Sequence, residues 1–187
     1  MVIIEERIAD MAEDTKTTEN TDIVPIGETS PKKIKVYLDN CAYNRPYDDQ
    51  SQAKIELETQ AKLKIQRMIK DQQIELVSSY MSLYECGENP DTSKAELITA
   101  FINQQSSVHV SLKNKDAIEE KAQEIMKTGI KFKDACHIAC AIIAKADYLV
   151  STDIRMLKYK TDKIKLINPI EFFTEELEEI EENGGNE

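Results

Sequence analysis

The sequence predicts an α/β fold, a three-layer α/β/α sandwich around a central, mostly parallel five-stranded sheet. Short runs rich in β-branched and aromatic residues alternate with longer segments of helical periodicity between residues 34 and 173. Strands separated in this way by helices run parallel, with right-handed crossovers that place helices on both faces of the sheet. The length of 187 residues suits one domain with a single core.

The elements follow from these patterns in chain order. The strand candidates are residues 34–38, 74–78, 107–111, 147–151 and 164–167. The helix candidates are approximately residues 50–71, 80–87, 93–104, 114–127, 132–145 and 153–159, and a last helix begins at 169. Asp91 or Thr92 is expected to cap the third helix, and Asn114 or Asp116 the fourth.

The net charge of −11 is distributed unevenly between a leader, a globular part and a tail. Residues 1–33, expected to be a flexible leader, carry four basic and eight acidic side chains, and the acidic tail at 174–187 carries seven acids and no base. The predicted domain between them, 34–173, holds twenty charges of each sign. The overall acidity therefore does not exclude an anionic substrate, but it argues against broad, non-specific duplex binding, which needs a basic stripe.

The sequence shows neither a membrane-spanning nor a targeting pattern. Apolar stretches such as residues 138–144 are far too short to cross a bilayer. The first six residues lack both the basic start and the long apolar run of a signal peptide. We therefore expect a cytoplasmic protein that does not associate with a membrane.

The four cysteines, Cys41, Cys86, Cys136 and Cys140, contain no Cys-x-x-Cys pair. This spacing disfavours a zinc ribbon or a thioredoxin-like motif. We interpret them as small buried thiols in a reducing compartment rather than as a disulfide or zinc site.

Four carboxylates lie at borders between the predicted elements. Asp39 follows the first strand, Glu85 comes one short helical stretch after the second, Asp134 opens an alanine-rich helix, and Asp153 follows the fourth strand. Such positions converge at the carboxyl edge of a parallel sheet, where ligands bind. Clustered acids repel one another unless a cation holds them, and carboxylates suit Mg²⁺ or Mn²⁺. Two such ions, roughly 3.5–4 Å apart, could activate a water for in-line attack on a phosphodiester.

Several neighbouring side chains could support this site. Asn40 and Thr152, each beside one of the acids, could orient a ligand. We interpret His137 as a packed or orienting imidazole rather than a base. A basic cluster downstream of the fourth strand is expected to be a solvated face that lies close enough to help hold phosphates; it comprises Lys158, Lys160, Lys163 and Lys165.

Each acid also has a purely structural interpretation. Asp134 and Asp153 stand where helix N-caps belong, and a side-chain carboxylate there satisfies free backbone N–H groups. Glu85 is harder to explain in this way, because its apolar neighbours indicate partial burial and a buried carboxylate needs a partner. The combination of the four, rather than any one of them, carries the functional interpretation.

In combination these segments resemble the PIN-domain nucleases. The similarity lies in Val-Tyr-Leu-Asp-Asn at 36–40, Glu85, Lys-Asp-Ala-Cys-His-Ile-Ala at 133–139 and Asp-Tyr-Leu-Val-Ser-Thr-Asp at 147–153. It extends over residues 34 to about 172, and the last two segments are its most specific part. Residues 40–50, which include Arg45, look like a bacterial subgroup described as VapC-like.

The resemblance implies a Mg²⁺- or Mn²⁺-dependent ribonuclease. Asp39, Glu85, Asp134 and Asp153 match the family's metal-binding quartet, and Thr152 matches its hydroxyl position. Asn40, Thr152, Arg45 and His137 would contact the substrate or the ligating acids. Such proteins are often homodimers and often the toxin of a toxin–antitoxin pair, so an antitoxin is an expected partner. Single-stranded or looped RNA suits a narrow acidic cleft better than a duplex. The leader and the acidic tail depart from the compact family pattern.

Two other function classes compete with the nuclease. A non-catalytic PIN-fold module that binds RNA or protein is the main alternative, although retention of all four acids disfavours it. A phosphoacceptor or phosphohydrolase domain also places Asp after the first strand. However, a haloacid-dehalogenase-type motif needs a second Asp at position 41, which is Cys, and residues 107–111 lack the acid of a receiver domain.

Overall fold

The computed structural model describes residues 32–175. Most of the expected leader and acidic tail therefore lies outside the described residues. The strands are β1 (Lys35–Leu38), β2 (Glu75–Ser79), β3 (Ser106–Val110), β4 (Tyr148–Val150) and β5 (Lys165–Ile167). The helices are α2 (Asn40–Asn44), α3 (Ala53–Lys70), α4 (Tyr80–Gly87), α5 (Thr92–Gln105), α6 (Lys115–Met126), α7 (Phe132–Ile143) and α8 (Ile154–Leu157). Two 3₁₀ turns, η1 (Arg45–Tyr47) and η2 (Leu112–Asn114), and a helix over 169–175 complete the described chain.

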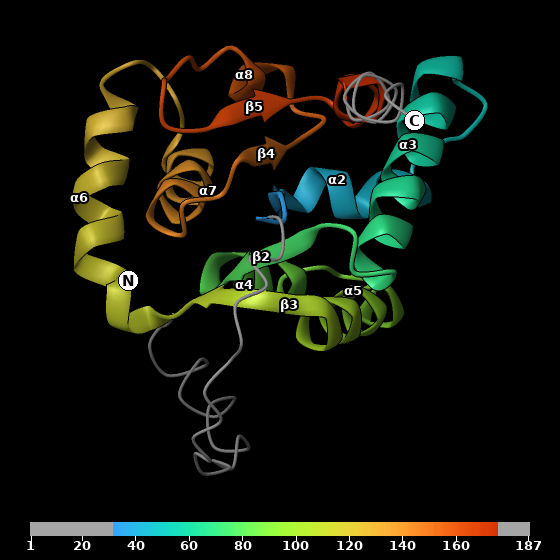
Figure 1. The fold of residues 1–187 in the computed structure, drawn as a ribbon, viewed down its shortest axis with the longest axis horizontal. Coiled ribbons are helices and arrows are strands. Elements are labelled where there is room, and N and C mark those ends of the chain that lie inside the picture. Colours follow the sequence, from blue (N-terminus) through green and yellow to red (C-terminus); the bar gives the residue numbers. More distant parts are fainter. Residues whose placement is uncertain (1–31, 176–187) are drawn as a thin grey trace, which may run out of the picture. The chain divides into compact units, whose positions relative to one another are not determined.

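The five strands form one sheet in the order β3-β2-β1-β4-β5, and every neighbouring pair is parallel (Figure 1). The predicted α/β sheet is confirmed. The chain moves outward from β1 to β2 and β3, then returns to place β4 on the other side of β1. The strand order therefore reverses between β1 and β4. In open α/β sheets the crevice beyond such a switch point is the usual ligand site.

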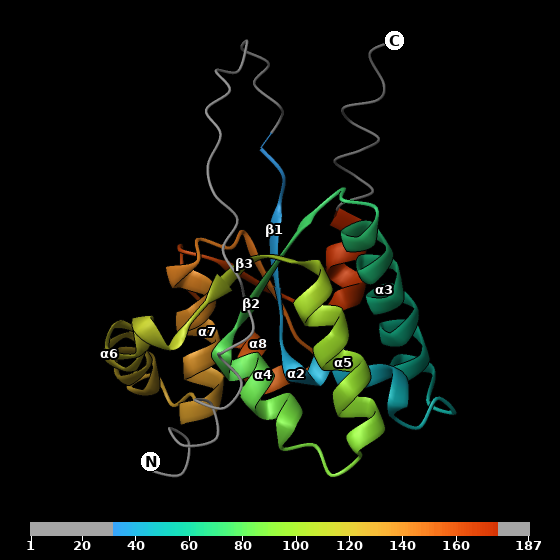
Figure 2. The ribbon, with the colours of Figure 1, turned by 90° about the horizontal axis from the view of Figure 1, so that it is seen from below.

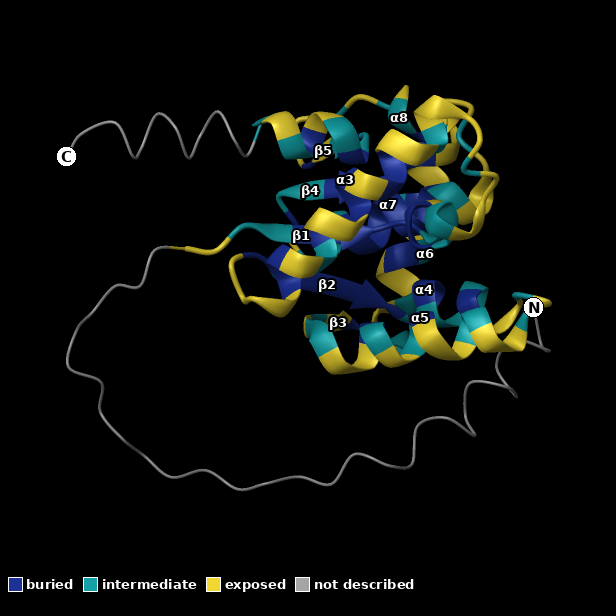
Figure 3. Ribbon diagram, turned by 90° about the vertical axis from the view of Figure 1, so that its right-hand side faces the viewer, coloured by how far each residue is buried: buried dark blue, intermediate teal, exposed yellow. Residues whose placement is uncertain are grey.

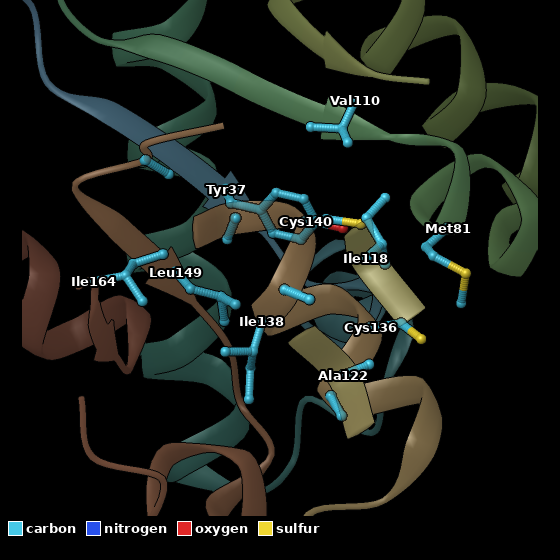
Figure 4. Packing of buried hydrophobic residues seen from close by; sticks show 14 of the residues in the cluster. Tyr37, Met81, Val110, Ile118, Ala122, Cys136, Ile138, Cys140, Leu149 and Ile164 are labelled. Atoms are coloured by element: carbon cyan, nitrogen blue, oxygen red, sulfur yellow. The ribbon is translucent and has the colours of Figure 1, made fainter. Parts of the chain in front are cut away.

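Helices cover both faces of the sheet, because side chains alternate in direction along each strand. Tyr37 and Leu149 point into one core, shared with α6 and α7, whereas Leu38 and Val150 point into the other, shared with α3 and α5. Figure 2 shows α6 and α7 on one side of the strands and α3 and α5 on the other. The inner strands β1, β2 and β4 are largely buried (Figure 3), and Figure 4 shows Tyr37 among the side chains of the first core.

Two short segments after β1 were not predicted. Residues 40–47 form α2 and the 3₁₀ turn η1, which are too short to show helical periodicity. The predicted cap of the third helix is confirmed, because the Asp91 side chain accepts a hydrogen bond from the backbone N–H of Lys94. Asn114 is the N-cap residue of α6, without a side-chain capping bond.

The prediction of buried thiols is confirmed for Cys86, Cys136 and Cys140 and wrong for Cys41, which is exposed. Ala42 and Tyr43 form the buried face of α2, so the preceding residue lies at the solvent side of this short helix. Within residues 32–175, no helix combines the length and the apolar character that crossing a bilayer requires.

Candidate active site

Asp39 lies at the carboxyl end of β1, at the switch point of the sheet. Its backbone N–H donates to the carbonyl oxygen of Val150, which extends the β1–β4 pairing by one bond. The side chain is buried and is the N-cap of α2: Oδ1 accepts from the backbone N–H of Asn40 at 2.6 Å. Oδ2 accepts from the Ser151 hydroxyl at 2.8 Å. Each oxygen keeps further lone-pair capacity for a cation.

Ser151 connects two of the four acids and was missed in the sequence. Besides donating to Asp39, its hydroxyl oxygen accepts from the backbone N–H of Asp153 at 3.0 Å. The hydroxyl residue expected to have an orienting role, Thr152, is buried and lines a hollow beside Asp153. A serine directly after a strand is common, so its position in the sequence alone did not indicate this role.

Asn40 contacts Asp39 through its backbone. Its amide oxygen lies 3.2 Å from Nδ2 of Asn44, which donates to it, and 3.7 Å from the Cys86 thiol. Its backbone N–H donates to Asp39, and the residue also lines a hollow beside Asp153, so the orienting role of its side chain stays a prediction.

Glu85 lies on α4, whose N-terminus is capped by the Ser79 side chain. His137 Nε2 is hydrogen-bonded to Glu85 Oε2 at 3.0 Å, and Lys133 Nζ lies 3.7 Å from Oε1. Burial favours a higher pKa for Glu85, but the hydrogen bond and charge of His137, with Lys133, lower it below its ordinary value. Glu85 is therefore anionic at neutral pH.

His137 balances this charge from α7. Burial lowers the pKa of the imidazole, but its bond to Glu85 and the charges of Asp39, Glu85 and Asp134 outweigh burial and raise the pKa above its usual value. Asp39, Glu85 and His137 each offer one ligand atom, and these atoms all lie within 4.8 Å of one another. This is the tightest convergence of the predicted site residues, and it could hold a divalent cation.

Asp134 and Asp153 do not belong to this group of three residues with closely spaced ligand atoms. Asp134 is half-buried in the first turn of α7, and its pKa is raised by burial and by the negative charges of Asp39 and Asp153. Its interpretation as an N-cap is wrong, because the helix begins two residues earlier and Lys131 holds the cap position. Asp134 therefore lies close enough to Asp39 and Asp153 for their charges to affect its pKa.

Asp153 is the N-cap of α8, as its structural interpretation predicted. Its two oxygens also pair with the guanidinium of Arg155, at 3.3 Å from Nε and 2.9 Å from Nη2. This bidentate pair is the main cause of the lowered pKa of Asp153. Arg155 was missed in the sequence, where a single arginine on a short helix gives no signal.

Two hollows open beside the four predicted site acids. Arg155 lines both of them, Asp153 lines the first and Asp134 lines the second. The first, of about 570 Å³, is lined by Asn40, Cys41, Asn44, Arg45, Asp48, Thr152, Asp153, Ile154 and Arg155. The second, of about 410 Å³, is lined by Thr128, Gly129, Ile130, Lys131, Asp134, Arg155, Lys158, Tyr159 and Lys160. Of the predicted lysine cluster, Lys158 and Lys160 line the second hollow, whereas Lys165 pairs with Glu175.

Arg45, expected to contact substrate, is held by two acids. Its Nη1 donates to Asp48 at 2.8 Å, and its Nε lies 2.9 Å from Oε2 of the buried Glu58. Arg45 also lines the first hollow, so its contact with substrate stays a prediction.

Cys41 borders the same hollow but is unsuited to act as a nucleophile. Burial of its sulfur and the charges of Asp39, Asp153 and Glu85 raise the pKa of the thiol to about 12, although the residue as a whole is exposed. A protonated thiol at neutral pH is a weak nucleophile. Chemistry at this edge therefore depends on the carboxylates.

Comparison with known proteins finds a match among solved structures only. No protein-family model matches the chain, and no curated protein sequence matches it. Among solved structures, the chain is similar to the crystal structure of VapBC2 from Rickettsia felis bound to a DNA fragment from their promoter. The sequence identity is 15%, the match covers 72% of this chain and 98% of that chain, and the TM-score is 0.47.

The raised pKa of Asp134 leads to a stability prediction for the metal-free protein. A carboxylate whose folded-state pKa exceeds its unfolded-state value destabilises the fold once the pH has risen through the folded-state pKa. Asp134→Asn should therefore raise the melting temperature at pH 7, by no more than a few degrees. The difference should vanish below the ordinary Asp pKa of about 3.9, where the wild-type side chain is protonated in both states.

Thermal unfolding of chelator-treated protein followed by circular dichroism checks this result. The control is Asp162→Asn, which removes an equal charge from an exposed residue. A lower melting temperature for Asp134→Asn at pH 7 would contradict the assigned repulsion.

Proposed function

We propose that this protein is a metal-dependent endoribonuclease that hydrolyses phosphodiester bonds in single-stranded or looped RNA. Asp39, Glu85, Asp134 and Asp153 would hold Mg²⁺ or Mn²⁺. The observation that carries the proposal is the convergence of Asp39 and Glu85 with His137 at the β1–β4 switch point, where all three ligand atoms lie within 4.8 Å. These residues come from three elements distant in sequence.

The donor set fits a divalent cation. A cation between two neighbouring carboxylates reduces the repulsion between their negative charges. Oxygen ligands of this kind suit Mg²⁺ and Mn²⁺. When bound, such an ion lowers the pKa of a water and neutralises charge that develops on the phosphate. Ser151 keeps Asp39 turned toward the centre, and His137 does the same for Glu85.

The second hollow supports an anionic, unpaired substrate. Three lysines that have no ion-pair partner in the described part of the chain line it: Lys131, Lys158 and Lys160. Asp134, one of the four predicted site acids, also lines this hollow. Free lysines in a concave surface bind phosphates, and Tyr159 in the same hollow offers a ring on which a base can stack. We expect the RNA backbone to pass along α8 and the turn before α7.

One observation favours the non-catalytic alternative. Both oxygens of Asp153 are paired with Arg155, which leaves that acid neutralised. A module that binds RNA through its lysines without cutting it would keep this pair. Catalysis requires Arg155 to release Asp153 or to contribute while paired, for example by contacting the phosphate.

Further sequence-based expectations stay predictions. These are a homodimer, an antitoxin partner, a role as toxin and a cytoplasmic location. The first two are tested by light scattering of the purified chain and by co-purification of a neighbouring gene product.

Cleavage of a fluorescent single-stranded RNA tests the proposal directly. Chelator-treated protein should be inactive, and Mn²⁺ or Mg²⁺ should restore cleavage in proportion to occupancy. A duplex of the same sequence should be cut more slowly, because its backbone cannot follow a narrow hollow. RNA binding without cleavage at any metal concentration would establish the non-catalytic alternative.

A further inference from the structure

His137 is almost completely buried, yet one of its ring nitrogens faces the proposed metal centre. The side chain is 1% exposed and lies on the apolar face of α7. Its Nε2 lies 3.0 Å from Glu85 Oε2, and His137 is one of the three residues whose ligand atoms lie within 4.8 Å of one another. A buried imidazole that served packing alone would not need a ring nitrogen beside a carboxylate.

The other ring nitrogen is held from the core. Nδ1 lies 2.7 Å from the Tyr37 hydroxyl, which in turn lies 2.7 Å from the Ser79 hydroxyl and 2.9 Å from that of Ser82. Tyr37 is fully buried on β1 within the core shared with α7 (Figure 4). The imidazole orientation is therefore fixed by a chain of buried hydroxyl groups.

This hydroxyl chain can accept either tautomer of the ring. With the proton on Nε2, the ring donates to Glu85 and Tyr37 donates to Nδ1. With the proton on Nδ1, the ring donates to the Tyr37 oxygen, and the Tyr37 proton turns to a serine oxygen, because every hydroxyl in the chain can donate or accept. The second arrangement leaves the Nε2 lone pair free and directed at the carboxylates. Ligating histidines are typically held in this way by a hydrogen bond at their other nitrogen.

We propose that His137 is a direct metal ligand through Nε2, and that the site takes a first-row transition ion such as Mn²⁺ or Co²⁺ in preference to Mg²⁺. The inference rests on the proposed function, since it concerns the same centre. Imidazole suits transition ions, whereas Mg²⁺ prefers oxygen ligands and retains its waters. A ligand set of two carboxylates and one imidazole therefore shifts selectivity away from Mg²⁺.

Electron spin-echo spectroscopy of the Mn²⁺-loaded full-length chain tests the nitrogen directly. The chain has two histidines, so labelling only histidine with ¹⁵N changes the modulation if an imidazole is coordinated. The labelled and unlabelled wild-type spectra should differ, and the difference should persist in His109→Gln. His109 is a matched control because it lies on edge strand β3, bonded to Ser78. Identical spectra for the labelled and the unlabelled wild-type protein would overturn the assignment.

Metal affinity measured by calorimetry gives a second readout. His137→Asn can retain the contact to Tyr37 but removes the nitrogen that faces the acids. Its Mn²⁺ and Co²⁺ affinities should fall by at least about 10- to 100-fold, the range that even outer-shell changes produce. Its Mg²⁺ affinity should change much less. Tyr37→Phe, which frees the ring but keeps its nitrogen, should weaken Mn²⁺ binding to a smaller extent. Equal losses for Mn²⁺ and Mg²⁺ in His137→Asn would contradict selectivity through the imidazole.

The proposed function and the assignment of His137 as a ligand can fail separately. If wild-type protein binds no divalent cation, the proposed function fails and this assignment with it. If wild-type protein binds Mn²⁺ and cleaves RNA but shows no histidine modulation, only the ligand assignment fails, and His137 orients Glu85 through the Nε2–H bond instead.

Discussion

Asp39→Asn is expected to reduce RNA cleavage by at least about 100-fold, the upper end of what changes to outer-shell partners of a metal cost. Asp39 is buried at the end of the central strand and is one of the two carboxylates in the closest ligand group. An amide has no negative charge for a divalent cation and presents one poor donor atom. The binding of Mn²⁺ should weaken together with cleavage.

The fold should tolerate this substitution. The amide oxygen can keep the bond from the Asn40 N–H that caps α2. The new NH₂ group would face the Ser151 hydroxyl, whose oxygen can accept a second bond beside the one from Asp153. The melting temperature of the metal-free variant should therefore stay close to that of the wild type.

Initial cleavage rates on single-stranded RNA with saturating Mn²⁺, together with Mn²⁺ calorimetry, measure the effect. Asp49→Asn is the matched control, because it removes an exposed acid outside the cluster. A folded Asp39→Asn protein that cleaves at the wild-type rate would exclude the site from catalysis. Loss of cleavage with unchanged Mn²⁺ binding would show that the ion lies on other residues.

Glu58→Ala is expected to have the largest effect on stability, about 3 kcal/mol, the lower end of the cost of breaking a buried ion pair, because Asp48 remains beside Arg45. Glu58 is fully buried on α3. Its Oε2 lies 2.9 Å from Arg45 Nε, although neither atom has an aligned hydrogen bond, and its Oε1 accepts from Asn168 Nδ2 at 2.7 Å. Removing the carboxylate leaves the guanidinium, which is only 17% exposed, with Asp48 at the surface as its remaining acidic partner.

The free energy of unfolding from urea titrations measures this cost. Glu56→Ala, an exposed acid one half-turn earlier on the same helix, is the control and should change it by less than about 0.5 kcal/mol. Arg45→Ala combined with Glu58→Ala forms a double-mutant cycle that isolates the pair from the contact with Asn168. If Glu58→Ala lowers the free energy of unfolding by less than about 1 kcal/mol, water solvates the Arg45 guanidinium in place of the lost carboxylate.

The sequence allowed a structural element to be predicted wherever a single segment showed the pattern of that element. The five strands were located to within one or two residues, because each is a compact apolar run bounded by polar residues. Parallel topology then predicted that Asp39 and Glu85 would approach each other, since both follow strands at one edge of the sheet. The short α2 and η1 were missed because a single turn has no measurable periodicity.

The contacts that orient the site could not be predicted, because they join segments far apart in the chain. Ser151 meets Asp39 across 112 positions, and Asn168 meets Glu58 across 110. A serine or an asparagine next to a strand is common, and only packing decides which acid it meets. The pairing of Arg155 with Asp153 is local, yet it depends on a rotamer choice that sequence does not encode.

The bond network of Asp39 separates the site into two parts with different prospects for redesign. Asp39 is tied by backbone and hydroxyl bonds to the ends of two adjacent central strands, so its position is fixed by the sheet itself. The cations that line the second hollow come from the turn before α7 and from the segment around α8, at the surface. Exchange of residues 158–160 should therefore change how tightly an anionic ligand is held in this hollow, without moving the buried carboxylate at the switch point. Affinity and the carboxylate centre could then be altered independently.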